Sequence, residues 1–163
     1  MKAKLDATDR KILTELQGEG RMSNVELSRK VGISPPATLE RVKKLEQSGV
    51  ITGYAAISDP QTLGLSCTSF VEVTLGRHGR EGVERFITEV TALNEVLECH
   101  HITGDADFLL KVVTWDIPSY EDFVLRKLTA LADVQHLKTL VVLSTLKQET
   151  QLPLQPKPQS EDE

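Results

Sequence analysis

The chain has 163 residues, a hydrophobic content of 39% and a formal net charge of −5. This size and composition suffice for one folded domain or two small ones, and no stretch approaches the roughly 18 consecutive apolar residues of a membrane span. The first residues, MKAKLD, lack the apolar segment of a secretory signal, so we expect a cytoplasmic protein. The two cysteines, Cys67 and Cys99, form no CxxC pair, and we interpret them as small buried hydrophobes.

The charge is divided unevenly along the chain. Residues 1–50 hold ten Lys and Arg against seven Asp and Glu, a net of +3, whereas residues 51–163 hold nine against seventeen, a net of −8. Such asymmetry indicates a basic module that can meet phosphate, joined to an acidic module with another task. Because an excess of +3 is small, the argument depends on where those charges lie.

Three short helical patterns open the chain. Asp6 is placed to cap the first helix. The segment Ser23-Asn24-Val25-Glu26 is a capping box, and the brief second helix that it begins ends at Gly32, where a left-handed residue fits. Ser34 is expected to cap the third helix, with Pro35 at the first helical position, where its missing N–H costs nothing.

The third helix carries the first functional prediction. We expect its buried face to consist of Leu39, Val42 and Leu45, which leaves these side chains outward: Pro36, Thr38, Glu40, Arg41, Lys43 and Lys44. A short capped helix, a tight turn and a second capped helix have the spacing of a helix-turn-helix, whose second helix enters the major groove of double-stranded DNA. The alternative is a plain three-helix bundle that binds no nucleic acid.

Within this surface, Thr38 and Arg41 are the candidates for base contacts, because threonine can touch a thymine methyl group and arginine can pair two acceptors on guanine. The other predicted DNA-binding residues lie at the start of the helix or carry positive charge that can reach phosphate: Arg29, Lys30, Ser34, Pro36, Lys43 and Lys44. A carboxylate near phosphate is repulsive, so Glu40 either accepts a hydrogen bond from cytosine or turns towards a neighbouring lysine.

The second half of the chain predicts a ferredoxin-like domain. Residues 50–57 are extended, which we interpret as a wing or linker strand that the turn residues 58–60 end. Strands are expected from residue 68 and at 96–102, 108–113 and about 137–146, with a helix after the first strand and another after the third. The order βαββαβ is the ferredoxin-like pattern, and the fold class is therefore α+β.

Such a sheet has both helices on one face, and its other face is apolar as well, as the segment FLLKVV at 108–113 indicates. An uncovered apolar face needs a partner, and a second copy of the chain is the simplest one. We therefore expect a homodimer, which would also supply two reading heads for a pseudo-palindromic DNA site.

Polar chemistry is concentrated at residues 99–108. Turn residues in this segment predict a hairpin, and its exposed N–H groups and carboxylates also suit the two charged ends of a small zwitterion, at Thr103, Gly104, Asp105 and Asp107. Adjacent His100 and His101 point to opposite faces of a strand, which argues against a metal site. The sequence contains no GxSxG, HExxH or phosphate-cradling glycine loop, so we expect no enzyme, no catalytic residues and no cofactor.

Several segments together resemble the Lrp/AsnC (feast/famine) family of bacterial and archaeal transcriptional regulators. They are LDATDRKIL at 5–13, VGISP at 31–35, RVKKLE at 41–46, GVITGY at 49–54, VLEC at 96–99 and TGDADFLLKV at 103–112. The likeness runs in the same order from residue 5 to about 147. Glu40 departs from it, since many relatives carry a basic residue there, and operator preference therefore cannot be transferred.

The resemblance implies a winged helix-turn-helix domain at 1–50, a linker strand and loop at 51–64, and a ligand-sensing and oligomerisation domain at 65–148. The Pro-rich, acidic composition of residues 149–163 predicts a disordered tail. It also implies dimers through the sheet faces, an octamer of four dimers in many members, and an amino acid or related effector bound between dimers near residues 103–107. The predicted function is effector-modulated transcriptional regulation without a membrane partner. The alternatives are an architectural DNA-binding protein without a ligand and a stand-alone metabolite-binding module.

Overall fold

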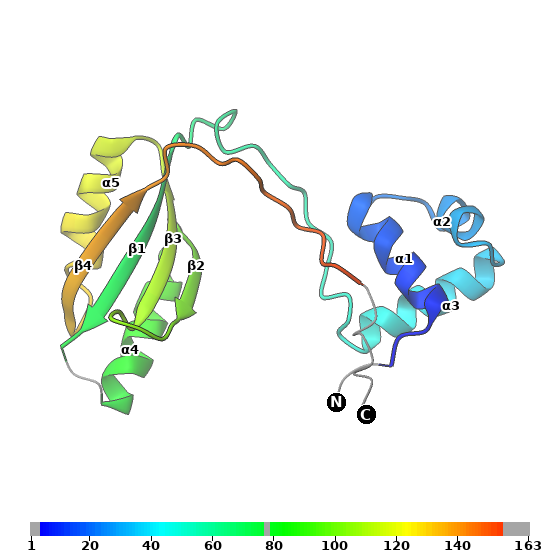
Figure 1. The fold of residues 1–163 in the computed structure, drawn as a ribbon, viewed down its shortest axis with the longest axis horizontal. Coiled ribbons are helices and arrows are strands. Elements are labelled where there is room, and N and C mark those ends of the chain that lie inside the picture. The colour runs from blue at the N-terminus through cyan, green and yellow to red at the C-terminus, as the bar shows by residue number, and fades with distance from the viewer. Residues whose placement is uncertain (1–3, 77–78, 155–163) are drawn as a thin grey trace, which may run out of the picture. The chain divides into compact units, whose positions relative to one another are not determined.

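A computed structural model describes residues 4–76 and 79–154. The chain divides into two compact units (Figure 1). We call Met1–Ile57 together with Lys147–Glu163 the helical unit, and Ser58–Leu146 the sheet unit.

The helical unit contains α1 (Ala7–Gly18), α2 (Asn24–Val31) and α3 (Pro35–Gln47). The predicted capping box between Ser23 and Glu26 is confirmed at α2, and the predicted cap Asp6 is confirmed at α1, where it forms a capping box with Asp9. Gly32 ends α2 in the left-handed region, at φ 83°, where a Cβ would be strained. At α3 the N-cap is Ser34, as predicted, but the Ser34 side chain makes no capping hydrogen bond.

The three helices bury one apolar cluster, which consists of Ile12, Leu13, Leu27, Val31 and Leu45. The predicted buried face of α3 is partly wrong. Leu39 is 44% exposed, whereas Thr38 is fully buried. Burial of Thr38 is inexpensive because its hydroxyl donates to the Ser34 carbonyl at 3.0 Å, which satisfies the polar group inside the helix.

The sheet unit has the predicted βαββαβ order. Its elements are β1 (Cys67–Leu75), α4 (Arg80–Thr91), β2 (Val96–His101), β3 (Phe108–Thr114), α5 (Ile117–Phe123), the π-helical turn η1 (Val124–Leu128) and β4 (Val134–Val141). The strands form one antiparallel sheet in the order β2-β3-β1-β4. The ferredoxin-like α+β class is therefore confirmed.

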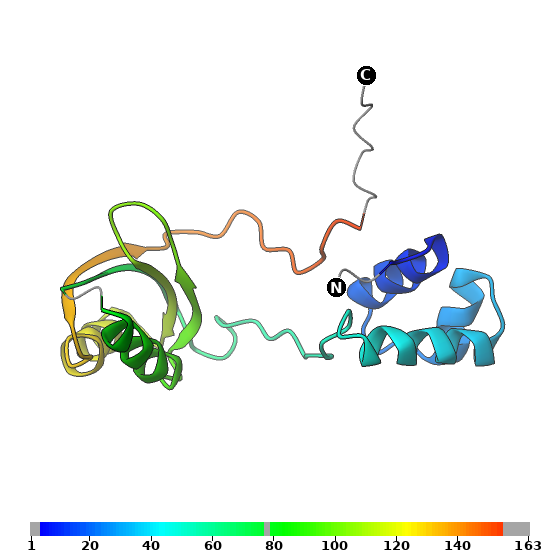
Figure 2. The same cartoon turned by 90° about the horizontal axis from the view of Figure 1, so that it is seen from below.

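Both helices of the sheet unit lie on one face of the sheet (Figure 2). Side chains alternate along β1, so that Val71, Val73 and Leu75 pack against the helices. The opposite face carries Phe70, which pairs in register with Lys111 of β3 and Leu140 of β4. This second face, which we call the open face, has no covering element in the described part of the sheet unit.

Three predicted boundaries differ from the structure. The last strand spans Val134–Val141 rather than about 137–146. Residues 50–57, expected to be a wing or linker strand, form no strand. Of the tail expected to be disordered, residues 155–163 lie outside the described residues, but the segment before them contacts α1. There the Gln17 side chain bonds both the N–H and the C=O of Leu152, at 2.7 and 3.2 Å, and Arg10 donates to the Leu154 carbonyl at 2.9 Å.

Candidate nucleic-acid interface and ligand site

The outward surface of α3 is set by its buried residues. Because a helix turns about 100° per residue, positions opposite Thr38 and Leu45 point away from the core. These positions are Pro36, Glu40 and Lys43, and all three are exposed. The sequence placed them on the outward face correctly. Leu39 is exposed and flanks the same surface. Its exposure could not be predicted from the sequence, because an apolar residue at this position fits a buried stripe equally well.

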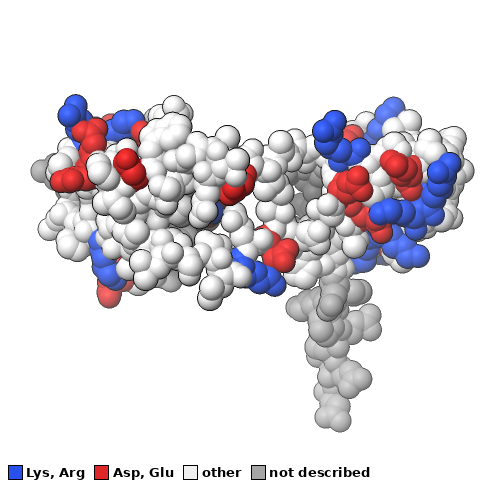
Figure 3. All heavy atoms as spheres, turned by 90° about the horizontal axis from the view of Figure 1, so that it is seen from above, with Lys and Arg blue, Asp and Glu red and all other residues white. Residues whose placement is uncertain are grey.

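Four of the predicted basic contacts are exposed and so available to phosphate: Arg29, Lys30, Lys43 and Lys44. In Figure 3, the Lys and Arg side chains of the helical unit, at the right of the view, form several groups with Asp and Glu side chains between them. One of these cations is already paired, since Lys30 Nζ lies 2.9 Å from Glu15 Oε2. The hydrogen bond and the charge of Glu15 raise the pKa of Lys30, which stays a cation.

The start of α3 offers less to an anion than the sequence suggested. Ser34 and Pro36 are exposed there, as expected. Of the first three residues of α3, however, Pro35 and Pro36 lack an N–H, and Ala37 alone has one. The next N–H, of Thr38, donates to the Ser34 carbonyl at 2.9 Å. A phosphate at this helix end would therefore meet few backbone donors.

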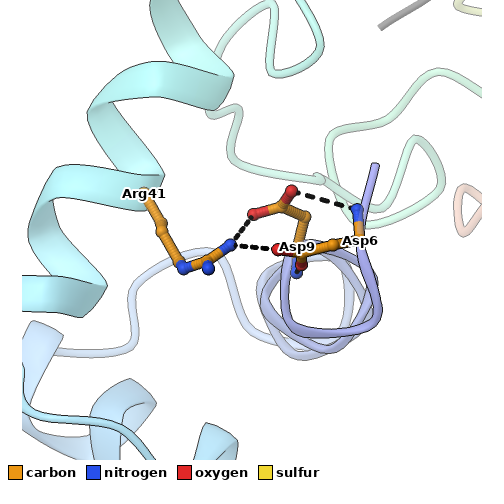
Figure 4. Close-up of polar contacts among 3 residues, drawn as sticks. All are labelled: Asp6, Asp9 and Arg41. Carbon is orange, nitrogen blue, oxygen red and sulfur yellow. Dashed lines mark hydrogen bonds and ion pairs between the residues drawn. The ribbon is translucent and has the colours of Figure 1, made fainter. Parts of the chain in front are cut away.

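The two residues predicted to touch bases make contacts inside the helical unit instead of projecting from the outward surface of α3. Thr38 has no exposed surface, and the prediction of a base contact is wrong for this side chain. Arg41 reaches back to the start of α1, where its Nη1 lies 2.7 Å from Asp6 Oδ2 and 2.8 Å from Asp9 Oδ1 (Figure 4). The hydrogen bond from the Asp9 backbone and the contact with Arg41 lower the pKa of Asp6. The hydrogen bonds to Asp6 and Asp9 in turn raise the pKa of Arg41, so Asp6 and Arg41 are both ionised at neutral pH.

In the sheet unit, the structure brings Thr103, Gly104 and Asp105 together in an exposed loop between β2 and β3. Gly104 has φ 126°, a conformation that only glycine adopts without strain. Asp107 differs from these three. Its Oδ2 accepts the Leu75 N–H at 2.8 Å and its own N–H donates to the Val73 carbonyl at 3.0 Å, so it fastens the loop to the end of β1.

A groove that the sequence did not reveal lies elsewhere in the sheet unit. Its volume is about 410 Å³, and its lining is mostly apolar: Ser58, Pro60, Leu63, Leu65, Asn94, Glu95, Leu97, Val113, Thr114, Trp115 and Ser119. Trp115 packs on Gly64, where an added Cβ would lie 3.2 Å from the indole ring. No local sequence pattern predicts this groove, because the residues that line it come from segments that are distant in sequence.

His100 and His101 make separate contacts. His100 Nε2 lies 3.1 Å from Glu98 Oε2, whereas the His101 ring stacks on Phe108 with centroids 5.0 Å apart. Across the residues that the structure describes, no group of three or more His, Cys, Asp or Glu side chains could hold a metal ion. Within the same ranges, no helix combines the length and apolar character that a membrane crossing requires.

Comparison with known proteins identifies both units. The chain matches the family model described as winged helix-turn-helix DNA-binding over residues 5–52 and the one described as Lrp/AsnC ligand binding domain over residues 68–152. The chain belongs to the Lrp/AsnC family.

Individual Lrp/AsnC relatives match nearly the whole chain. It is 45% identical over 148 residues to the leucine-responsive regulatory protein of Escherichia coli strain K12, which covers 91% of this chain and 90% of the relative. It is similar to a transcriptional regulator of Neisseria meningitidis solved in complex with L-Met, with a TM-score of 0.89, 39% identity and coverage of 93% and 97%. An AsnC family regulator of Agrobacterium tumefaciens gives a TM-score of 0.88 at 33% identity, with coverage of 92% and 97%.

Membership of the Lrp/AsnC family decides between the functional alternatives. This chain is a sequence-specific DNA-binding transcriptional regulator whose DNA binding is modulated by a small effector, and it is not an enzyme. The helical unit carries the DNA-binding domain and the sheet unit carries the ligand-binding domain. The predicted family, fold class and function are thus confirmed. The individual contact residues stay predictions, except Thr38, whose side chain is buried.

Proposed function

We propose that this protein is a cytoplasmic, homo-oligomeric regulator that reads duplex DNA with the outward surface of α3 and responds to an amino acid bound near the β2–β3 loop. The observation that supports it most directly is the exposed face of α3, where Pro36, Glu40 and Lys43 point away from the core. A recognition helix must present such a face to enter the major groove.

The contacts divide by chemistry. Arg29, Lys30, Lys43 and Lys44 carry exposed positive charge and bind phosphate, which supplies affinity but no sequence information. Leu39 can touch a thymine methyl group from the flank of the helix, and Glu40 can accept a hydrogen bond from cytosine N4. Among the described residues, Glu40 makes no ion pair within the protein, which favours the contact with cytosine over a turn towards a neighbouring lysine.

The open face of the sheet supports dimerisation. Phe70, Leu109 and Leu140 are apolar side chains on the same face of three neighbouring strands. The Lys111–Glu98 and Lys138–Glu72 ion pairs, at 2.9 and 3.0 Å, lie among them, because Lys111 is opposite Phe70 and Glu72 is opposite Leu109 on the two central strands. Apolar side chains interleaved with paired charges of both signs fit a second copy of the same face. The dimer holds two DNA-binding units, and four dimers assemble into an octamer, as the family resemblance implies.

The effector site is proposed at Thr103, Gly104 and Asp105. These residues are exposed on a loop that Asp107 holds against β1. A related regulator was solved with L-Met, so an amino acid is the effector class that we propose here. The Asp105 carboxylate suits its ammonium group, and loop N–H groups suit its carboxylate. The effector lies between dimers and shifts the equilibrium between assembly states that differ in DNA affinity.

Fluorescence anisotropy tests the function directly. A labelled duplex from the region upstream of the gene is compared with a shuffled duplex at physiological salt, with and without L-Met, L-Leu or a pool of the other amino acids. We expect preference for the upstream duplex, and a change in its affinity with one of the amino acids. Equal affinity for both duplexes, with no response to amino acids, would overturn the proposal in favour of an architectural protein that recognises phosphate alone.

A further inference from the structure

Two carboxylates at the start of α1, those of Asp6 and Asp9, hold the side chain of Arg41, which belongs to the proposed recognition helix α3. We propose that Asp6 and Asp9 keep the Arg41 guanidinium away from DNA phosphate and thereby lower both the affinity of the helical unit for DNA and the dependence of that affinity on salt. The inference rests on the DNA binding described above, and it concerns a residue that sequence alone assigned to base contact.

The two carboxylates are divided between two tasks. Asp6 Oδ1 accepts the Asp9 N–H at 2.7 Å and Asp9 Oδ2 accepts the Asp6 N–H at 3.2 Å, which forms the capping box of α1. The remaining oxygen of each, Asp6 Oδ2 and Asp9 Oδ1, accepts from the same Arg41 nitrogen (Figure 4). We call the carboxylates of Asp6 and Asp9 together the clamp. Because the capping bonds already fix both aspartate side chains, binding Arg41 costs conformational entropy mainly for the arginine side chain.

The position of Arg41 on α3 agrees with this role. Arg41 lies three residues after Thr38 and four before Leu45, the two fully or nearly fully buried positions of the helix. Residues spaced by three or four share a face, so Arg41 is on the side of α3 that meets α1. The outward positions, Glu40 and Lys43, lie on other sides of the helix.

The clamp is exposed enough to open. The side chain of Arg41 is 37% exposed and that of Asp6 is 52% exposed, so water and ions reach the pair. Lys44, Lys4 and one further carboxylate, Glu40, border the same shallow site, beside Ala37. Exposed ion pairs exchange readily with other ionic partners. A guanidinium released from the carboxylates therefore lies next to cations that already favour phosphate, and it can add one contact to the DNA backbone.

A salt-dependence cycle on the full chain tests the proposal with a labelled duplex of random sequence. The variants are Asp6→Asn with Asp9→Asn, Arg41→Met, and all three together. Asparagine keeps the oxygen that accepts each capping bond but replaces the clamp oxygen with an NH₂ group that cannot hold arginine. Each phosphate contact steepens the dependence of log affinity on log salt by about 0.9, or roughly 3.5-fold in affinity between about 50 and about 200 mM salt.

We expect the double variant to bind more tightly and to show a slope steeper by about 0.9 for each bound chain. Arg41→Met should keep the native slope, and adding it to the double variant should abolish the gain. The effect of the two asparagine substitutions on the salt slope is compared between chains with and without Arg41. Deleting two negative charges has the same general effect in both chains, so the difference between them reports on Arg41 alone. Circular dichroism verifies folding, and Arg41→Gln replaces Arg41→Met should the latter unfold.

Two outcomes would overturn the proposal. A shallower slope for Arg41→Met would mean that Arg41 contacts phosphate in the native protein. An equal change from the two asparagine substitutions with and without Arg41, or no change at all, would mean that the cluster only ties α1 to α3. Failure of the unmodified chain to bind any duplex is a separate result, and it contradicts the proposed function itself.

Discussion

Leu39 is a large apolar side chain on the flank of the recognition helix, 44% exposed, while its neighbour Thr38 is fully buried. An apolar side chain at this place can contact thymine methyl groups in the major groove. Leu39→Ala should therefore reduce the preference for the specific operator over random DNA by about 1 kcal/mol, roughly fivefold. Paired titrations of the two duplexes by anisotropy measure this preference.

Thr38→Val is the matched control for Leu39→Ala. Valine keeps the buried volume, and the Ser34 carbonyl that accepts the Thr38 hydroxyl still accepts the Thr38 N–H. The free energy of unfolding in urea should change by less than about 1 kcal/mol, and operator preference should not change. A loss of base preference in Thr38→Val would show that this side chain reaches DNA after all.

Asp105 and Asp107 are expected to separate effector response from stability. The Asp107 carboxylate accepts the partly buried Leu75 N–H at 2.8 Å, so Asp107→Ala should destabilise the sheet unit by about 1–3 kcal/mol. Asp105 is exposed and makes no such contact with a strand end among the described residues. Asp105→Ala should therefore change stability by less than about 0.5 kcal/mol while blunting the amino-acid response. Urea unfolding measures the stability of each variant, and effector titration measures its response. A large stability loss in Asp105→Ala would contradict the assignment of Asp105 to effector binding.

At the residue scale, the sequence predicted which residues cap the helices better than it predicted where side chains on the helices point. It placed Asp6, Ser23 and Gly32 at helix ends correctly, because capping depends on a few neighbouring residues. It put Arg41 on the DNA-facing side, because nothing in the local pattern indicates that two aspartates of another helix hold its side chain. Thr38 was misplaced for a related reason, since its self-satisfying hydrogen bond lets a polar residue occupy the core.

Among the elements, the docked C-terminal segment gives the next prediction. Gln17 of α1 bonds both backbone groups of Leu152, and Leu154 packs against the core of the helical unit. Gln17→Ala should lower the free energy of unfolding by about 1 kcal/mol and release the segment. Hydrogen exchange at residues 150–154 and protease cleavage there should both accelerate.

Gln148→Ala is the control for the docked segment, because Gln148 is exposed and lies before the contacts with α1. It should leave exchange and cleavage at their native rates. Equal rates in Gln17→Ala and the unmodified chain would show that the segment is not held by this side chain.

The order of elements could be predicted, but the ends of several could not. Alternation in β1 and the helical period around Phe86 and Phe123 are local signals, and they predicted βαββαβ. The start of β4 was missed by three residues, since Val134 follows Asp133, a turn residue with φ 64°, in a segment with mixed periodicity. The contact between Gln17 and Leu152 joins residues 135 apart, and a Pro-rich, acidic composition gave no sign of it.

For the whole molecule, the uneven charge corresponds to a division of labour. The net +3 of residues 1–50 belongs to the DNA-binding domain, and it already counts Asp6, Asp9 and Glu15, which pair with Arg41 and Lys30 inside that domain. Most of the acidic remainder belongs to the sheet unit, which need not approach DNA and whose open face carries apolar side chains between paired charges. Two DNA-binding units of low individual affinity gain strength when dimerisation makes the second binding event intramolecular.

Dimerisation through the open face gives the last prediction. Leu140 pairs in register with Phe70 and is 44% exposed in the single chain, so Leu140→Glu would bury an unpaired carboxylate in the dimer, which costs several kcal/mol. We expect at least about a tenfold shift towards monomer in sedimentation velocity, and a parallel loss of operator affinity because only one DNA-binding unit then engages. Leu125→Glu makes the same change at a 64% exposed position in η1, and it should leave dimerisation intact. A dimer that tolerates the first change and dissociates with the second would place the interface on the helical side of the sheet unit instead.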